Sequence, residues 1–205
     1  MKLPPRALAR PDDSSDSGFY AQPRLVTHID EAAIAAVTQL YRERLPSDGI
    51  ILDLMSSWVS HLPPEVPYKR IVGLGMNAEE LKANGRLNAW MVHDLNESPR
   101  LPFGDEEFDA VACCVSVQYL TRPVEVWREA ARACRPGAPA LITFSNRCFP
   151  TKAVLAWQTT GDAGHAALVS KYLQEAGGWQ GIEFLDLSLS PGKSDPLFAV
   201  VALRQ

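Results

Sequence analysis

The sequence predicts an α/β domain: a mostly parallel sheet of about seven strands, with helices on both faces and an antiparallel hairpin at one edge. Apolar runs of strand length alternate with helix-length segments from residue 50 to residue 176, which indicates parallel strands joined by right-handed crossovers. The last two apolar runs, 182–190 and 196–203, are separated by a turn too short for a crossover and should pair antiparallel. Hydrophobic residues make up 46% of the 205 residues, enough for the core of one domain.

The chain begins with a polar segment. Residues 1–18 are rich in proline, serine and aspartate, a composition typical of a mobile tail, so we expect a single domain over residues 19–205. The first predicted helix lies within residues 27–45, where apolar residues recur on one face and Asp30 is placed to cap the start. A Pro-Ser-Asp-Gly turn then ends this helix.

Strands and helices alternate along the rest of the chain. The apolar run at 108–117 is nearly continuous, as expected of a strand covered on both faces. Pro123 begins an amphipathic helix, and a glycine near residue 161 breaks the last helical region. The predicted strands are 50–54, 69–74, 89–95, 108–117 and 138–145, and the predicted helices are 56–62, 77–81, 123–134 and 151–176.

Composition and charge argue against several classes of function. A net charge of −4 without a cluster of lysine and arginine argues against nucleic-acid binding. No apolar run reaches the length of about 18 residues that a membrane span needs. The four cysteines form no CxxC pair and the four histidines have no metal-ligand spacing, so we expect neither disulfides nor a metal site. This cysteine usage is typical of a reducing, cytoplasmic compartment.

Two stretches carry a family resemblance. Residues 93–111, HDLNESPRLPFGDEEFDAV, place an acid after one strand and then LPF and FDAV before the next. Residues 125–146, EVWREAARACRPGAPALITFSN, give a helix, an RPG turn and a strand. In order and spacing, roughly residues 30–204 resemble the class I S-adenosylmethionine-dependent methyltransferases, which have a Rossmann-like fold. The resemblance implies S-adenosylmethionine as the cofactor and methyl transfer as the reaction.

The resemblance also implies which residues bind the adenosine part of the cofactor. Asp94 would accept the amino hydrogens of the adenine, and Leu95 would offer its backbone N–H to a ring nitrogen. For Asp94 the alternative is a turn residue after a strand. The family usually ends its second strand with an acid that holds the ribose diol, and Gly75 stands at that position here. Asn77 either reaches one ribose hydroxyl or caps the next helix.

The turn after the first strand departs further from the family, which has glycines there because they let the backbone approach the ligand. This chain reads MSSWV at 55–59. Met55 and Trp58 add bulk where the amino acid end of the cofactor would lie, whereas Ser56 offers a hydroxyl donor. Asp53 either holds the turn through backbone N–H groups or simply ends the strand. The turn either binds the cofactor in a modified way or has lost that role, and a tryptophan, a methionine and a histidine close together favour the former. Packing of Trp58 in the core would explain part of this composition equally well.

Candidate acceptor-binding residues come first from the segment before the first helix and from the end of the fourth strand. Tyr20, Arg24 and His28 are placed to form a lid over the cofactor. Arg24 is also placed to pair with the methionine carboxylate of the cofactor, although a solvated arginine explains it equally well. Gln118 and Tyr119 stand where the family often contacts its substrate.

The loop after the fifth strand supplies the third group of candidates. Asn146, Arg147 and Lys152 are expected at the mouth of the same cleft, where cations would suit an anionic or carbonyl-bearing acceptor. The alternative is that the two basic side chains are simply solvated, as lone basic pairs usually are. No residue stands out as a general base. Methyl transfer from a sulfonium needs chiefly positioning and desolvation, and His28 or Tyr119 would serve if the acceptor is a hydroxyl or an amine.

The sequence therefore predicts methyl transfer from S-adenosylmethionine to a small molecule, by a monomer or homodimer with no nucleic-acid or membrane partner. A non-catalytic protein of the same fold, binding a ligand or a partner chain, is the first alternative. A dinucleotide-binding oxidoreductase is the weakest, because the glycines at 73–75 follow the second strand and lack the third glycine of that motif.

Overall fold

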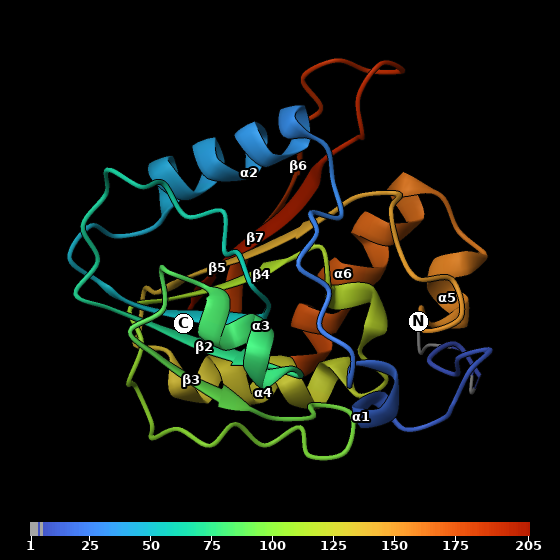
Figure 1. The fold of residues 1–205 in the computed structure, drawn as a ribbon, viewed down its shortest axis with the longest axis horizontal. Coiled ribbons are helices and arrows are strands. Elements are labelled where there is room, and N and C mark those ends of the chain that lie inside the picture. The colour runs from blue at the N-terminus through green and yellow to red at the C-terminus, as the bar shows by residue number, and fades with distance from the viewer. Residues whose placement is uncertain (1–3, 5) are drawn as a thin grey trace.

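The computed structural model describes residue 4 and residues 6–205, and its centre is a seven-stranded sheet with the order β3-β2-β1-β4-β5-β7-β6 (Figure 1). The strands are β1 (Ile50–Ser56), β2 (Arg70–Gly75), β3 (Ala89–Val92), β4 (Ala110–Cys114), β5 (Pro139–Phe144), β6 (Trp179–Asp186) and β7 (Phe198–Arg204). The helices are α1 (Asp16–Phe19), α2 (Glu31–Arg44), α3 (Ala78–Ala83), the 3₁₀ turn η1 (Val117–Tyr119), α4 (Pro123–Ala133), α5 (Leu155–Gln158) and α6 (Asp162–Ala176).

The pairing of the strands confirms the predicted fold class. Strands β1 to β5 are parallel to one another, whereas β7 is antiparallel to both of its neighbours, β5 and β6. The chain reverses direction here because the loop 187–197, which contains no helix, joins β6 to β7, whereas a parallel pair needs a crossover of about a dozen residues or more. All five parallel strands consequently end at the same edge of the sheet, where open α/β sheets bind their ligands.

Helices cover both faces of the sheet, as predicted, because successive strand residues point to opposite sides. On one face, Val37 and Tyr41 of α2 pack in a core cluster that includes Ile51 of β1. The other face carries the larger cluster, in which Trp127 of α4 and Tyr172 of α6 pack with strand residues such as Leu52. Figure 1 shows α2 above the sheet and α4 and α6 on its other side.

Helix termini lie close to the predicted positions. Asp30 caps α2 by accepting a hydrogen bond from the backbone N–H of Ala33, and Asn77 caps α3. Pro123 occupies the first turn of α4, and the break near Gly161 separates α5 from α6. The structure finds no helix, among residue 4 and residues 6–205, that is long and apolar enough to cross a membrane.

The predicted helix at 56–62 is wrong. Strand β1 continues to Ser56 through a bulge at Met55, and the chain after it is irregular. Hydrogen bonds from side chains of this stretch to distant residues replace the bonds of a helical turn, as described below. The strand predicted at 108–117 ends at Cys114, and its last residues turn into η1.

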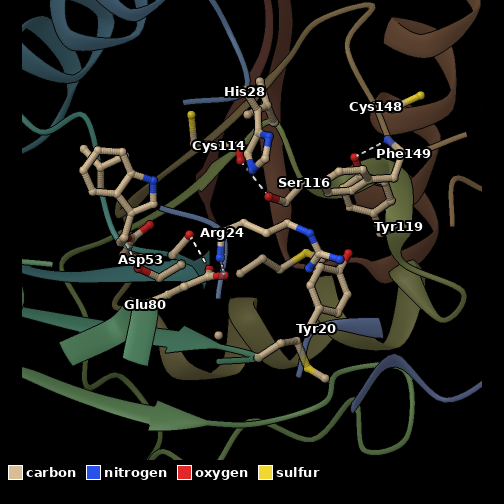
Figure 2. Close-up of a pocket in the computed structure, with 18 of the residues that line it drawn as sticks. Tyr20, Arg24, His28, Asp53, Glu80, Cys114, Ser116, Tyr119, Cys148 and Phe149 are labelled. Carbon is tan, nitrogen blue, oxygen red and sulfur yellow. Dashed lines mark hydrogen bonds between the residues drawn. The ribbon is translucent and has the colours of Figure 1, made fainter. Parts of the chain in front are cut away.

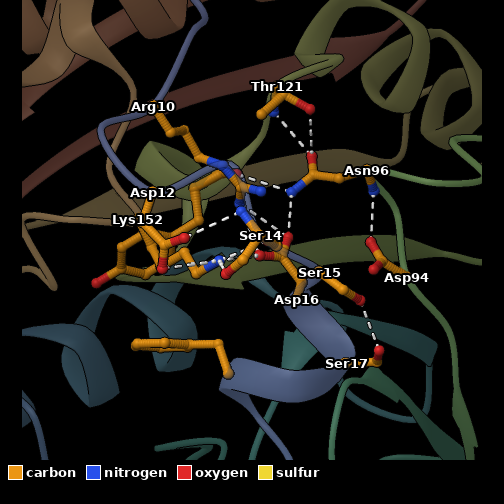
Figure 3. A network of polar contacts seen from close by, with 12 residues as sticks. Arg10, Asp12, Ser14, Ser15, Asp16, Ser17, Asp94, Asn96, Thr121 and Lys152 are labelled. Atoms are coloured by element: carbon orange, nitrogen blue, oxygen red, sulfur yellow. Dashed lines mark hydrogen bonds and ion pairs between the residues drawn. The ribbon is translucent and has the colours of Figure 1, made fainter.

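The N-terminal segment, defined as residues 6–18, is packed against the body of the protein, in contrast to the mobile tail expected from its composition. Arg10 forms an ion pair with Asp16 at 2.8 Å, and only 8% and 5% of their side chains are exposed (Figure 3). Backbone N–H groups of residues 155 and 156 donate to the carbonyls of residues 9 and 7. Residues 1–3 and 5 of the expected tail lie outside the described residues.

Lys152 explains part of this packing and corrects a prediction. It was expected at the mouth of the cleft, but its side chain is fully buried beneath the N-terminal segment. Its Nζ donates to the Ser14 carbonyl at 2.7 Å and lies 3.2 Å and 3.4 Å from carboxylate oxygens of Asp12 and Asp16. A buried ammonium needs such partners, and the acids of the polar N-terminal segment supply them.

Candidate functional site

One pocket of about 440 Å³ lies at the carboxyl ends of the five parallel strands, and its volume is within the usual range of ligand sites, roughly 300–1,000 Å³. At least one residue that lines the pocket comes from each of these strands or from the loop that follows it. Most of the predicted site residues line this pocket together: Tyr20, Arg24, His28, Asp53, Met55, Ser56, Trp58, Gly75, Asp94, Leu95, Tyr119, Asn146 and Arg147. Three predicted residues, Asn77, Gln118 and the buried Lys152, do not line it.

The turn after β1 is held by a buried acid. The Asp53 side chain accepts hydrogen bonds from the hydroxyls of Ser56 and Ser60, each at 2.5 Å, so it orders the turn through side chains and not through backbone N–H groups. Burial raises the pKa of Asp53 to about 6, and the two serine hydrogen bonds oppose that rise. Asp53 is therefore a buried residue of the pocket wall, and its carboxyl group has neutral donors as its partners.

The path of the backbone in this turn requires a glycine at position 75. The bulge at Met55, which has φ 59°, pairs Ser56 with Gly75, and the Ser56 carbonyl oxygen then lies 2.1 Å from where a Cβ at Gly75 would stand. No side chain fits in that space. The backbone of the glycine-free turn therefore leaves no room at position 75 for an acid.

Asn77 is engaged elsewhere. Its side-chain oxygen accepts hydrogen bonds from the backbone N–H groups of Glu79 and Glu80. This is the helix cap, one of the two roles that the sequence predicted for Asn77. Its amide nitrogen donates to the carbonyls of Tyr20 and Ala21 at 2.9 and 3.2 Å. Asn77 therefore fastens residues 20–30, here called the strap, to α3.

Glu80 is a pocket residue that the sequence did not single out. Its carboxylate is 7% exposed, accepts the Arg24 backbone N–H at 2.7 Å and accepts the Ser57 hydroxyl at 2.6 Å. The only signal in the sequence is its place three residues after Asn77, which resembles a capping box and predicts a local role. The side chain instead reaches the strap and the turn after β1, which are distant in sequence.

Trp58 also holds the strap. Its indole N–H donates to the Val26 carbonyl at 2.9 Å, and the side chain belongs to neither core cluster. In Figure 1 the strap is the blue segment that runs from α2 to α1. Because the strap and the strand ends line the same pocket, this segment forms one of the pocket walls. The bulk of Trp58 serves this wall and not the core of the domain.

Arg24 places a cation in the pocket, and no carboxylate oxygen of the described residues lies within 4.0 Å of its guanidinium nitrogens. Its guanidinium carbon lies 4.5 Å from the ring centre of Phe19, 5.4 Å from Phe149 and 5.7 Å from Tyr20. One terminal nitrogen donates to the Phe19 carbonyl, and the other is buried with no hydrogen-bond partner. Figure 2 shows the side chain extending from beside Glu80 toward Tyr20. A carboxylate or carbonyl oxygen of a ligand would satisfy this nitrogen.

Asp94 forms the turn after β3. Its Oδ1 accepts the backbone N–H groups of Asn96 and Glu97 at 2.8 and 3.3 Å, a local Asx turn. The half-buried side chain also lines the pocket, next to the buried Leu95. The turn role and the proposed adenine role are compatible, because a carboxylate has two acceptor oxygens and the turn uses Oδ1.

The two candidate bases differ in environment. Tyr119 is 8% exposed, its hydroxyl accepts the Phe149 backbone N–H at 2.9 Å, and burial raises its pKa to about 12. His28 stands at the pocket edge with its ring 5.3 Å from Phe149, and partial desolvation lowers its pKa. Both side chains are neutral near pH 7, and of the two only the His28 imidazole has a basic nitrogen that can accept a proton.

The remaining candidates lie at the mouth or behind the wall. Asn146 and Arg147 are exposed at the mouth, where Arg147 lies 3.8 Å from Asp195. Gln118 is fully buried and donates to the Val115 carbonyl at 2.8 Å, so it supports the wall from behind. Cys114 lines the pocket, and burial raises the pKa of its thiol to about 11. No group of three potential metal ligands occurs in the part of the chain that the structure describes.

Backbone strain gathers around the pocket. Among the described residues, five other than glycine have positive φ, and three of them, Met55, His61 and Val115, line the pocket. Such conformations cost about 1–3 kcal/mol each and persist where surrounding contacts enforce them, often at functional sites. Asp48 and Glu106 are the other two and lie outside the pocket. A turn that had lost its role would not be expected to retain this strain.

Comparisons with known proteins agree with the fold. The family described as "Methyltransferase domain" matches residues 54–142. The [4+2]-cyclase SpnF has a similar structure, with a TM-score of 0.64 at 15% identity, over 92% of this chain and 91% of that one. An S-adenosylmethionine-dependent methyltransferase from Aquifex aeolicus gives 0.58 at 15% identity, over 85% and 92%. One from Mesorhizobium loti gives 0.58 at 13%, over 82% and 98%. No curated protein matches the sequence significantly.

Proposed function

We infer that this chain, which has the class I methyltransferase fold and a methyltransferase domain, transfers a methyl group from S-adenosylmethionine to a small-molecule acceptor. The observation that carries the proposal is the pocket itself. It lies at the carboxyl ends of all five parallel strands, and residues from the strap, the turn after β1 and the turn after β3 converge on it. The domain match and the fold support methyl transfer in general, and the acceptor is our proposal.

The residues present fit the cofactor. Asp94 and Leu95 would hold the adenine, and the hydroxyls and backbone of the turn after β1 would hold the amino acid end. The buried unpartnered nitrogen of Arg24 is suited to a carboxylate, either that of the methionine part or one on the acceptor. When bound, the cofactor supplies an electrophilic methyl group on a sulfonium.

The chain contributes positioning and desolvation, which are what an in-line methyl displacement requires. The strap closes one side of the pocket and limits the access of water to it. Neutral His28 would accept a proton from a hydroxyl or amine acceptor, whereas the phenol of Tyr119 keeps its proton and would donate or orient. Phe149, Tyr20 and the Arg24 guanidinium favour a planar acceptor that carries an anionic or carbonyl group.

Calorimetric titration tests the cofactor. We expect S-adenosylmethionine and S-adenosylhomocysteine to bind the full chain with micromolar affinity, and Asp94→Ala to weaken both by about 10-fold or more, because a charge-assisted contact to the adenine is lost. Asp13→Ala, at an exposed aspartate outside the pocket, is the matched control and should bind like the wild type. Absence of binding by either ligand at millimolar concentration would contradict the proposal.

A non-catalytic protein of this fold is the second candidate, and one observation favours it. The turn after β1 lacks glycine, and Met55 and Trp58 both line the pocket at that point. Folds of this kind host more than one function, as the neighbour named as a [4+2]-cyclase illustrates. Binding of S-adenosylmethionine without turnover against a panel of planar carboxylic acids, phenols and amines would favour this candidate.

A further inference from the structure

We propose that Glu80, on the first turn of α3, binds the ribose hydroxyl groups of the cofactor, in place of an acid at the end of β2. This inference rests on the proposed function, because it concerns the same cofactor. It assigns a role to a buried carboxylate that the sequence pattern explains only as part of a helix cap.

The first step is that position 75 cannot supply the acid. A Cβ there would stand 2.1 Å from the Ser56 carbonyl oxygen and 3.1 Å from Leu81 Cδ2. The obstacle at 2.1 Å is backbone, held in register by the pairing of β1 with β2, so a rotamer change cannot remove it. A vicinal diol in this pocket must therefore find its acceptor on another residue.

The second step is that Glu80 reaches the same part of the pocket. It lines the pocket together with Gly75 and Met76, although it belongs to the first turn of the helix that follows β2. Ser57, from the turn that closes position 75, donates its hydroxyl to Glu80 Oε2 at 2.6 Å. The turn after β1 therefore has two effects. Its backbone leaves no room for an acid at position 75, and its Ser57 hydroxyl orients the Glu80 carboxylate.

The third step is that Glu80 has acceptor capacity to spare. Each carboxylate oxygen has two lone-pair directions, and each accepts one recorded hydrogen bond: Oε1 from the Arg24 backbone N–H and Oε2 from Ser57. Within the described part of the chain, no lysine, arginine or histidine nitrogen lies within 4.0 Å of this carboxylate. A buried carboxylate without a cation is costly unless further donors reach it, and the two hydroxyls of a ribose are such donors.

A structural role is the competing explanation, because Glu80 also tethers the strap through Arg24. The two roles differ in one measurable respect. A tether affects every ligand of the pocket equally, whereas a ribose contact affects only ligands that carry the hydroxyls.

The test combines two proteins with two ligands. Affinities of wild type and Glu80→Gln are measured by calorimetry for S-adenosylhomocysteine and for its 2′,3′-dideoxyribose analogue. We expect Glu80→Gln to weaken S-adenosylhomocysteine by about 10- to 100-fold and to change the affinity for the analogue less than about threefold. Glu79→Gln, at an exposed acid on the same turn, is the matched control and should change neither.

An equal loss for both ligands would overturn the inference while leaving the proposed function intact. Failure of the wild type to bind S-adenosylhomocysteine would overturn both. If Glu80→Gln does not fold, Glu80→Asp keeps the charge but withdraws it by one methylene. It should show the same selective loss for the ligand with hydroxyls, and an unselective loss would again contradict the ribose contact.

Discussion

The turns after β3 and after β1 face the same pocket but are built in different ways. The turn after β3 is local: Asp94 accepts the N–H groups of residues two and three positions along the chain. The turn after β1 depends on distant residues, since Ser57 donates to Glu80 and Trp58 donates to the strap, 23 and 32 residues away. The first matches the motif on which the family resemblance rests, and the second does not. The comparison teaches that a turn at the edge of a sheet can be ordered either by its own residues or by contacts with distant segments.

The largest effect should come from placing a side chain at Gly75. Gly75→Ala should lower the free energy of unfolding by about 3 kcal/mol or more, because its Cβ would meet the Ser56 backbone at 2.1 Å. Urea denaturation measures this loss. The matched control is Gly85→Ala, where no atom lies within 4 Å of the added Cβ, and it should change stability by less than about 0.5 kcal/mol. A loss in Gly75→Ala as small as that in Gly85→Ala would show that the Ser56 backbone can move aside.

Asp53 should give the next largest effect, through pH. Its folded pKa of about 6 lies above the ordinary value of 3.8, so the folded state binds the proton more tightly than the unfolded state. This group therefore lowers stability as pH rises from about 4 to about 6, by up to about 3 kcal/mol, and has its full unfavourable effect above that range.

Asp53→Asn cannot ionise, and its carbonyl oxygen still accepts the serine hydroxyls. Relative to wild type, we expect it to gain stability progressively between pH 4 and pH 6 and to show a constant difference above. Chemical denaturation across this range measures the difference. Asp13→Asn, at an exposed site, is the control. Parallel stability curves for wild type and Asp53→Asn would disprove the buried, proton-binding role.

The smallest effect concerns the link between the turn after β1 and the strap. Trp58→Phe removes the indole donor to the Val26 carbonyl and keeps an aromatic ring, so the strap should loosen by about 0.5–1 kcal/mol. Limited trypsin cleavage after Arg24, within the strap, should become about two- to fivefold faster. Trp90→Phe, on the exposed edge strand β3, should leave the rate unchanged. An unchanged rate in Trp58→Phe would mean that Asn77 and Glu80 hold the strap without Trp58.

The features of the fold and the site that could be predicted are those that depend on residues close together in the sequence. The caps at Asp30 and Asn77, the helix beginning at Pro123 and the antiparallel edge pair follow from residues within a few positions of one another. Most predicted site residues line one pocket because parallel strands end at one edge of a sheet. The helix predicted at 56–62 was wrong, because propensity there yields to hydrogen bonds with distant partners.

By itself the sequence determined the alternation of strands and helices, the reversed pair at the end of the sheet and the family that the chain resembles. These features depend on periodicity and short turns, which a linear pattern contains. Only the tertiary structure decided that Ser56 closes position 75, that Glu80 enters the pocket from α3 and that a polar N-terminal segment covers a buried Lys152. Each of these depends on a contact between residues about 20 or more positions apart, and folding alone brings such residues together.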